Sequence, residues 1–238
     1  MSKIQQLKAE LSMMASPERA AHSQRFFKTG KGEYAEGDIF IGLTNPQIHG
    51  LVKRYLCLDF QEIQQLLNSK VHEERLLALL ILVRKFQKAK KDRKTQYFIY
   101  NFYLKNTRNI NNWDLVDLSA HKIVGDFLLK NQDQSVLRSL AKSENIWERR
   151  IAIISTMAFI RERKFGESLA LAEMLMGDKH DLIHKAVGWA LREIGKKNQN
   201  VLETFLIQNY KKMPRTMLRY AIEKFPEEIR KKYLSGAI

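Results

Sequence analysis

Trp113 and Asp117 stand four residues apart in the stretch NINNWDLVDLSAHKIVGDF, which has the pattern of a helix. This spacing places both side chains on one helix face. A carboxylate beside an aromatic ring could stabilise a developing cation, orient a water molecule or act as a base. A salt bridge to a nearby Lys or Arg would explain Asp117 equally well from the residues alone. The pair is therefore a candidate for chemistry, with a structural role as the alternative.

The residues that precede Asp117 are explained by the start of a helix. Asn111 or Asn112 can accept hydrogen bonds from the free amides of the first turn. Asp114 lies in that turn, where the helix dipole favours a negative charge. We therefore expect no catalytic role for Asp114.

Metal and cysteine chemistry are not expected. His180 and His184 are four residues apart, but no third ligand follows at a suitable spacing, so we predict neither a metal site nor a cofactor. Cys57 is the only cysteine, which excludes an intramolecular disulfide and fits a reducing cytosol. Its neighbours Leu56 and Leu58 suggest that it packs in the core.

The charge balance favours a polyanionic partner. The chain has 41 Lys and Arg against 26 Asp and Glu, a formal charge of +15. Basic groups placed near phosphates release condensed counterions, which favours nucleic acid over an anionic membrane surface. A general solubilising role for the charge is the alternative. No apolar run reaches the roughly 18 to 20 residues that span a bilayer, and the N-terminus resembles an amphipathic helix, so we expect a cytoplasmic protein without membrane contact.

Apolar residues recur at three- and four-residue spacing, which predicts an all-α protein. The exception is residues 28–46, a Gly-rich segment that we expect to form an ordered surface loop. Beyond residue 70, helices repeat with a period of about 35 residues, with a further unit at about Trp113. The period follows from aligning the helices at Arg75, Arg150, Lys185 and Arg219, with twice the spacing between the first two.

Such a period predicts an α-solenoid of HEAT-like repeats. We expect one domain over residues 1–238, with N-terminal helices and the Gly-rich loop in 1–70 and more regular repeats in 71–238. Equivalent positions of successive repeats would line a curved, basic concave face. Its expected members are Arg150, Lys185 and Arg219, with Trp113, Asp117 and Trp189 on or near it. The alternative is that these basic residues are ordinary solvated positions at helix starts.

Several segments together resemble the bacterial DNA alkylation repair glycosylases of the AlkD family. The resembling segments are NWDLVD at 112–117, SENIWERRIAI at 143–153, HKAVGWALRE at 184–193 and FIGLTNPQI at 40–48. The Gly-rich sequence KTGKGEYAEGD is more elaborate than is usual for this family, and Phe26 and Phe27 stand where some members have a tyrosine.

The resemblance implies a curved helical-repeat enzyme that hydrolyses the N-glycosidic bond of cationic N3- and N7-alkylated purines without a base-binding pocket. It implies that Asp117 is the catalytic carboxylate and that Trp113 and Trp189 contact the deoxyribose and backbone at the lesion. It also implies that Arg150 contacts DNA, and Arg192 matches a further motif arginine.

The leading hypothesis is therefore a monofunctional alkylpurine DNA glycosylase that acts on double-stranded DNA as a monomer. The alternative is a non-catalytic HEAT-like module that binds damaged or branched DNA. A protein-interaction scaffold is a third possibility, but it would leave the charge and the Trp, Asp and Arg set unexplained.

Overall fold

The fold was analysed in a computed structural model, which describes residues 2–131 and 133–238. Within these residues the backbone forms helices, turns and a single isolated β-bridge, so the all-α prediction is confirmed. The chain divides into two compact units, Met1–Ser119 and Ala120–Ile238. They are called the N-terminal and the C-terminal unit below. The prediction of a single continuous domain with a basic concave face stays a prediction.

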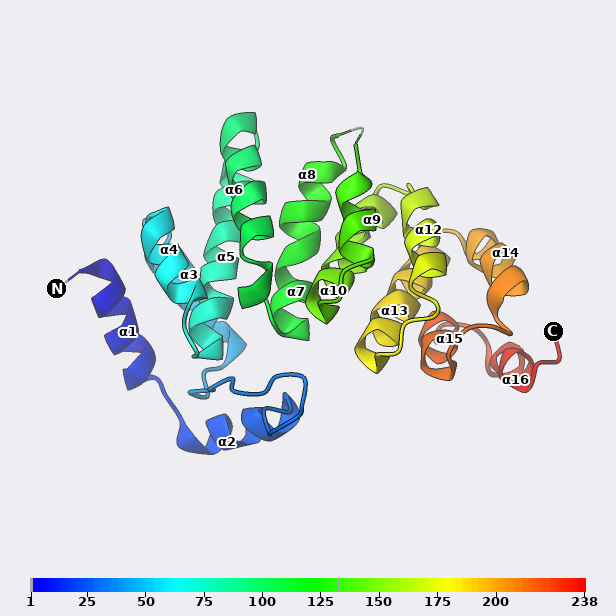
Figure 1. The fold of residues 1–238 in the computed structure, drawn as a ribbon, viewed down its shortest axis with the longest axis horizontal. Helices are drawn as coiled ribbons and strands as arrows, with labels where there is room; N and C mark the ends of the chain where they lie inside the picture. Colours follow the sequence, from blue (N-terminus) through cyan, green and yellow to red (C-terminus); the bar gives the residue numbers. More distant parts are fainter. Residues whose placement is uncertain (1, 132) are drawn as a thin grey trace. The chain divides into compact units, whose positions relative to one another are not determined.

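Most helices of the N-terminal unit stand beside one another, and the second helix of the chain lies across their lower ends in the view of Figure 1. The elements of this unit are α1 (Lys3–Met13), α2 (Pro17–Phe26), α3 (Asn45–Arg54), α4 (Phe60–Leu67), α5 (His72–Lys88), α6 (Arg93–Lys105), the 3-10 turn η1 (Thr107–Asn109) and α7 (Trp113–Ala120). The centre of this unit is α5, which packs against α3, α4 and α6. Its apolar run from Leu76 to Val83 is buried throughout, as expected for a helix covered on several sides.

The Gly-rich loop is fixed to the first turn of α5. Ile39 forms a parallel bridge with Val71, and the buried carboxylate of Glu73 accepts hydrogen bonds from the amides of residues 41–43 at 2.8 to 3.3 Å. Gly42 has a φ of +82°, and a Cβ there would lie 2.3 Å from the carbonyl oxygen of Ser16. Only glycine therefore allows the loop to approach α2 this closely.

The C-terminal unit consists of two layers of helices. Its elements are the π-helical turn η2 (His121–Gly125), α8 (Asp126–Leu128), α9 (Ser135–Ala141), α10 (Ile146–Ser155), α11 (Met157–Arg161), α12 (Gly166–Met174), α13 (Asp181–Lys197), α14 (Gln199–Asn209), α15 (Arg215–Ala221) and α16 (Glu227–Ser235). Helices α10, α13 and α15 pack in a row, and α9, α12 and α14 cover the same row from one side.

The same hydrogen-bonded turn opens α5 and α10. Three residues before α5, the Ser69 hydroxyl accepts from the amide two residues later, and its carbonyl accepts from Arg75 Nη1 at 2.8 Å. Three residues before α10, Ser143 makes the same two bonds, with its carbonyl accepting from Arg149 Nη1 at 2.9 Å. Both sequences read Ser, four residues, Glu-Arg. The repeated contact is direct structural support for an internal repeat.

A third copy of this turn opens α13. Asp178 takes the place of the serine, its carboxylate accepts from the amide of His180, and its carbonyl accepts from His184 Nε2 at 2.5 Å. Arg75 is therefore equivalent to Arg149 and His184. The alignment of Arg75 with Arg150 was wrong by one residue, because a sequence period does not reveal which arginine closes the turn.

Counting from the first residue of each helix brings the remaining candidates into register. The fifth residues are Leu76 in α5, Asp117 in α7, Arg150 in α10, Lys185 in α13 and Arg219 in α15. Three of these helices carry a cation at this position, whereas α7 carries a carboxylate.

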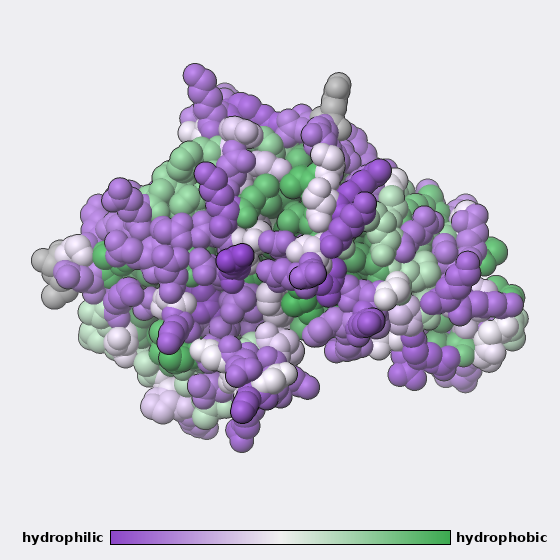
Figure 2. All heavy atoms as spheres, in the orientation of Figure 1, coloured by the Kyte–Doolittle hydropathy of each residue, from purple (hydrophilic) through white to green (hydrophobic). Residues whose placement is uncertain are grey.

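Two further features concern the surface. Cys57 is exposed, so the expectation that it packs in the core was wrong: it lies in the turn after α3, while Leu58 beside it is fully buried. In the face shown in Figure 2, hydrophilic residues cover much of each unit, in keeping with the chain's many charges. Among the described helices, none combines the length and apolar character that a bilayer crossing would need.

Candidate active site on helix α7

Hydrogen bonds hold helix α7 at its start and near its end. At its start, Asn112 is buried, and its side-chain oxygen accepts from the amide of Trp113 at 2.8 Å, which confirms the expected cap. Near its end, the Ser119 hydroxyl hydrogen-bonds to Tyr103 of α6 at 2.9 Å. The side chains between these anchors are therefore presented by a fixed segment of backbone.

Trp113 belongs to a cluster of aromatic rings formed with the end of α2. Its indole stacks on Phe27 with ring centroids 5.1 Å apart and 16° between the planes, and it meets Phe26 edge to face at 6.0 Å. Phe27 also stacks on Phe40 of the Gly-rich loop at 4.8 Å. Trp113 is half-buried, while Phe26 is 59% exposed. The cluster thus has a packed inner side and an aromatic edge that faces solvent.

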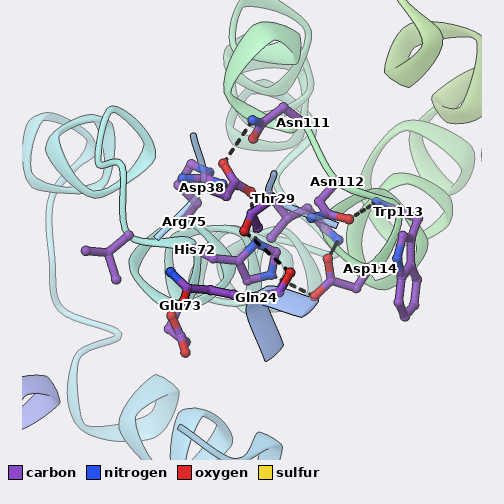
Figure 3. Close-up of polar contacts among 12 residues, drawn as sticks. Gln24, Thr29, Asp38, His72, Glu73, Arg75, Asn111, Asn112, Trp113 and Asp114 are labelled. Carbon is purple, nitrogen blue, oxygen red and sulfur yellow. Dashed lines mark hydrogen bonds and ion pairs between the residues drawn. The ribbon is translucent and has the colours of Figure 1, made fainter. Parts of the chain in front are cut away.

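Asp114 points away from this aromatic edge, toward α5 (Figure 3). One of its carboxylate oxygens lies 2.8 Å from Nε2 of His72, and Nδ1 of the same imidazole lies 3.5 Å from Asp38 in the Gly-rich loop. Asp38 also pairs with Arg75 at 2.7 Å and accepts from the Asn111 amide at 3.2 Å. We call Asp38, His72, Arg75 and Asp114 the His72 ion group.

The His72 ion group places a protonated imidazole in the interior. Burial by itself lowers the pKa of His72, but the charge and hydrogen bond of Asp114 and the hydrogen bond of Asp38 raise it to about 9. Burial opposes ionisation of Asp38, and the hydrogen bond from His72 and the charge of Arg75 nevertheless lower its pKa. At neutral pH the group therefore holds two cations and two anions, which balances its charge.

Asp117 lies one turn beyond Trp113 and is half-buried. On α6, complete burial raises the pKa of Tyr103, and the negative charge of Asp117 raises it further. Asp117 therefore lies near this tyrosine. Asp114 is engaged by the His72 ion group, so the two carboxylates of α7 have different surroundings. As expected from the sequence, Asp114 has a structural explanation, although its main partner is His72 and not the helix dipole.

The other predicted site residues lie in the C-terminal unit. Arg150 is 5% exposed, and its Nη1 donates to the carbonyl oxygen of Leu182 at the start of α13 at 2.5 Å. Lys185 pairs with Asp181 at 2.8 Å. The half-buried Trp189 donates from Nε1 to Glu193 at 3.1 Å. Their predicted contacts with DNA stay predictions.

The remaining two cations differ in their surroundings. Arg192 pairs with Glu223, which follows α15, and its side chain is 17% exposed. Arg219 is exposed on α15 and forms no ion pair within the described residues. Arg219 is therefore the member of the predicted basic row that is best placed to exchange solvent for a phosphate.

Sequence reasoning missed His72 and Asp38. Neither has a local signal, because they lie 42 and 76 positions before Asp114 and meet it only in the folded chain. The start of α5, HEER, is polar, but a polar helix start is common and does not indicate a buried ion group. Within the described residues, no cluster of three or more His, Cys, Asp or Glu side chains could hold a metal ion.

Comparisons with known proteins agree with this architecture. A solved structure from Enterococcus faecalis, described as a predicted DNA alkylation repair enzyme, superposes with a TM-score of 0.66 at 17% identity, over 90% of this chain and 98% of that one. AlkD2 from Streptococcus mutans superposes with a TM-score of 0.52 at 19% identity, over 88% and 98%. At these identities the likeness concerns the fold. A sequence comparison with curated proteins gives no match.

The sequence profile described as DNA alkylation repair enzyme matches residues 7–225, which is most of the chain and includes the segments of both units discussed above. The chain belongs to the DNA alkylation repair enzyme family.

Proposed function

We propose that this protein is a monofunctional DNA glycosylase that removes cationic N3- or N7-alkylated purines from duplex DNA. Family membership supports a role in alkylation repair. The observation that carries the proposed chemistry is Asp117, a carboxylate at the helix position that α10, α13 and α15 fill with cations, one turn from Trp113. An anion at this helix position suits a reaction in which positive charge develops on the substrate.

The proposed reaction breaks the bond between C1′ of the deoxyribose and the purine nitrogen. The bonding electron pair moves to the purine, which is already cationic, so the base leaves neutral and needs no protonation. Positive charge then develops on the sugar, as in other glycosyl transfers. Asp117 would stabilise that charge electrostatically. A water molecule adds to C1′ and loses a proton, which leaves an abasic site in an intact strand.

The aromatic edge of the site would hold the damaged nucleotide. Trp113 is half-buried against Phe27, so its ring is fixed and can pack on the deoxyribose. An indole face also attracts a cation. Phe26 extends this edge into solvent and offers a further apolar contact to the nucleic acid. In this proposal the lesion is selected by its charge and its labile bond, and not by an enclosed base pocket.

The cations of the C-terminal unit would bind phosphates and orient the duplex. Arg219 is exposed, and the pairs formed by Lys185 and Arg192 are bridges at or near the surface that exchange with phosphate at little cost. Arg150 donates to the backbone that begins α13, so its contribution would include holding that helix start in place. We propose that the protein acts as a monomer, and that Trp189 contacts the DNA backbone, as the family resemblance implies.

The test is a base-release assay with duplex DNA that carries a single 7-methylguanine. The purified protein is expected to release free 7-methylguanine, measured by chromatography, and to leave a strand that breaks only after alkali treatment. Strand breaks without alkali would contradict a monofunctional enzyme. Tight, salt-sensitive binding of the duplex without release of 7-methylguanine or 3-methyladenine would favour the alternative of a non-catalytic DNA-binding module.

A further inference from the structure

The His72 ion group joins three segments that are far apart in the sequence. His72 opens α5 and is 2% exposed, Asp38 comes from the Gly-rich loop, and Asp114 comes from the first turn of α7. Phe40 and Phe27 pack on the imidazole, with ring centroids 4.3 Å and 5.3 Å from it. The ion group is therefore closed off by the same rings that support Trp113.

Both ring nitrogens of His72 can donate to a carboxylate only while the imidazole is charged. A neutral histidine has one N–H donor, whereas the imidazolium has two. Here both ring nitrogens face a carboxylate oxygen, at 2.8 Å for Asp114 and 3.5 Å for Asp38. Loss of the proton would leave one of these buried carboxylates facing a nitrogen lone pair, which is unfavourable in a site shielded from water.

The group also fixes the position of Trp113 from two directions. Asp114 is the residue next to Trp113, so its bond to His72 holds the backbone of the first turn of α7. Phe27 contacts the His72 imidazole, with ring centroids 5.3 Å apart, and it also stacks on the Trp113 indole, with ring centroids 5.1 Å apart. A shift of His72 would therefore move the backbone and the ring partner of Trp113 together.

We propose that His72 and Asp38 are positioning residues, which hold the first turn of α7 so that Trp113 and Asp117 keep the geometry that base release requires. This inference rests on the proposed function and adds a regulatory property to the same site. The two residues touch neither substrate nor reacting atoms in this account; they act through Asp114 and Phe27. The Gly-rich loop thereby has a role, since it delivers Asp38 to the group.

The positioning is sensitive to alkaline pH. The charged groups that face His72 are Asp38 from the loop, Asp114 from α7 and Arg75 from α5 itself. The pKa of His72 is raised to about 9 in the folded chain, above the ordinary value of 6.5. The contribution of the charged imidazole is therefore complete below about pH 6.5 and is lost as the pH rises through about 9. Base release is expected to fall over the same range.

Two substitutions of His72 separate its two contacts. The amide of His72→Gln can reach the place of Nε2 and donate to Asp114, whereas the shorter amide of His72→Asn can reach only the place of Nδ1, beside Asp38. If the link to α7 matters, the single-turnover rate of base release will fall by roughly 10-fold or less in His72→Gln and by roughly 100-fold in His72→Asn. The DNA dissociation constant should change little in either variant.

The pH profile distinguishes positioning from general loss of stability. The wild-type rate should fall on the alkaline side with a midpoint near 9, and this fall should vanish in both variants because neither amide titrates. Ile63→Ala, a deletion in the buried part of α4 outside the ion group, is the control for lowered stability and should keep the wild-type profile. Equal rates in all four proteins, or an alkaline fall that persists in both His72 variants, would overturn the inference.

A readout without catalysis separates this inference from the proposed function. The indole ¹⁵N–H resonance of Trp113, assigned with Trp113→Phe, should shift with a midpoint near pH 9 in the wild type and should not titrate in the His72 variants. A wild type that shows this shift but releases no base would contradict the proposed function and support the positioning of Trp113. A wild type that releases base while the Trp113 resonance stays constant to pH 10 would overturn the positioning.

Discussion

Asp114 and Asp117 are three residues apart on α7, and their surroundings give them different tasks. Asp114 forms a short ion pair with a buried imidazole, and its side chain is 13% exposed. Asp117 is half-buried, one turn from an indole that stands at a solvent-facing aromatic edge. We therefore expect Asp114 to stabilise the fold and Asp117 to act in the chemistry.

The matched substitutions Asp114→Asn and Asp117→Asn should separate stability from activity. Asp114→Asn leaves a buried cation with a weakened partner, so the free energy of unfolding should fall by about 2–4 kcal/mol. Asp117→Asn removes a half-buried charge and leaves the His72 ion group intact, so the free energy of unfolding should fall by less than in Asp114→Asn. Urea unfolding followed by circular dichroism measures both. Equal stability losses in the two variants would show that Asp117 is held as firmly as Asp114, against the assignment made above.

At the scale of elements, the close approach of α13 and α15 depends on Gly188. A Cβ at this position would lie 2.5 Å from the Met217 carbonyl oxygen and 2.5 Å from the Tyr220 Cβ. Gly188 directly precedes Trp189, so this contact also sets the position of the second predicted site tryptophan. Gly50 of α3 is also a helical glycine, but it makes no close contact: a Cβ there would meet no atom within 4 Å.

Replacing these two glycines by alanine should change stability in opposite directions. Gly188→Ala must push α13 and α15 apart and should lower the free energy of unfolding by about 1–3 kcal/mol. Gly50→Ala removes backbone freedom from the unfolded chain without a clash and should raise it by about 0.5–1 kcal/mol. Thermal unfolding of each variant, compared with that of the wild type, shows whether its stability falls or rises. A Gly188→Ala protein as stable as Gly50→Ala would mean that the two helices are not in backbone contact.

The elements were largely predictable from the sequence, whereas the links between them were not. The three- and four-residue period gave the helices, and Asn112 marked the start of α7. The repeat register was missed by one residue because the turn before α5, α10 and α13 is closed by a side chain six positions away, which a hydrophobic period does not report. The His72 ion group joins residues up to 76 positions apart, so its members could be named only from the folded chain.

An excess of positive charge is a property of the whole molecule, because the N-terminal and the C-terminal unit both carry it. The formal charge of +15 is distributed over both units, and the predicted phosphate contacts lie on α10, α13 and α15. Binding of duplex DNA by such a chain is driven by release of counterions from the phosphates. Affinity should therefore depend strongly on salt and weakly on base sequence.

The salt dependence of duplex binding can be tested by fluorescence anisotropy between 50 and 200 mM NaCl. The logarithm of the association constant should fall linearly with the logarithm of the salt concentration, and Arg219→Gln should reduce the slope by about one. Lys231→Gln on α16, where the lysine pairs with Glu227, is the control and should leave the slope unchanged. A slope that Arg219→Gln does not alter would remove Arg219 from the phosphate-binding set.

The most direct test of the central claim is the single-turnover rate at which wild type and Asp117→Asn release 7-methylguanine from saturated duplex DNA. We expect Asp117→Asn to lower this rate by about 10² or more, because the developing charge on the sugar loses its anion, while the DNA dissociation constant stays within a few-fold of the wild-type value. An Asp117→Asn protein that releases the base at the wild-type rate would contradict the assignment of Asp117 as the catalytic carboxylate.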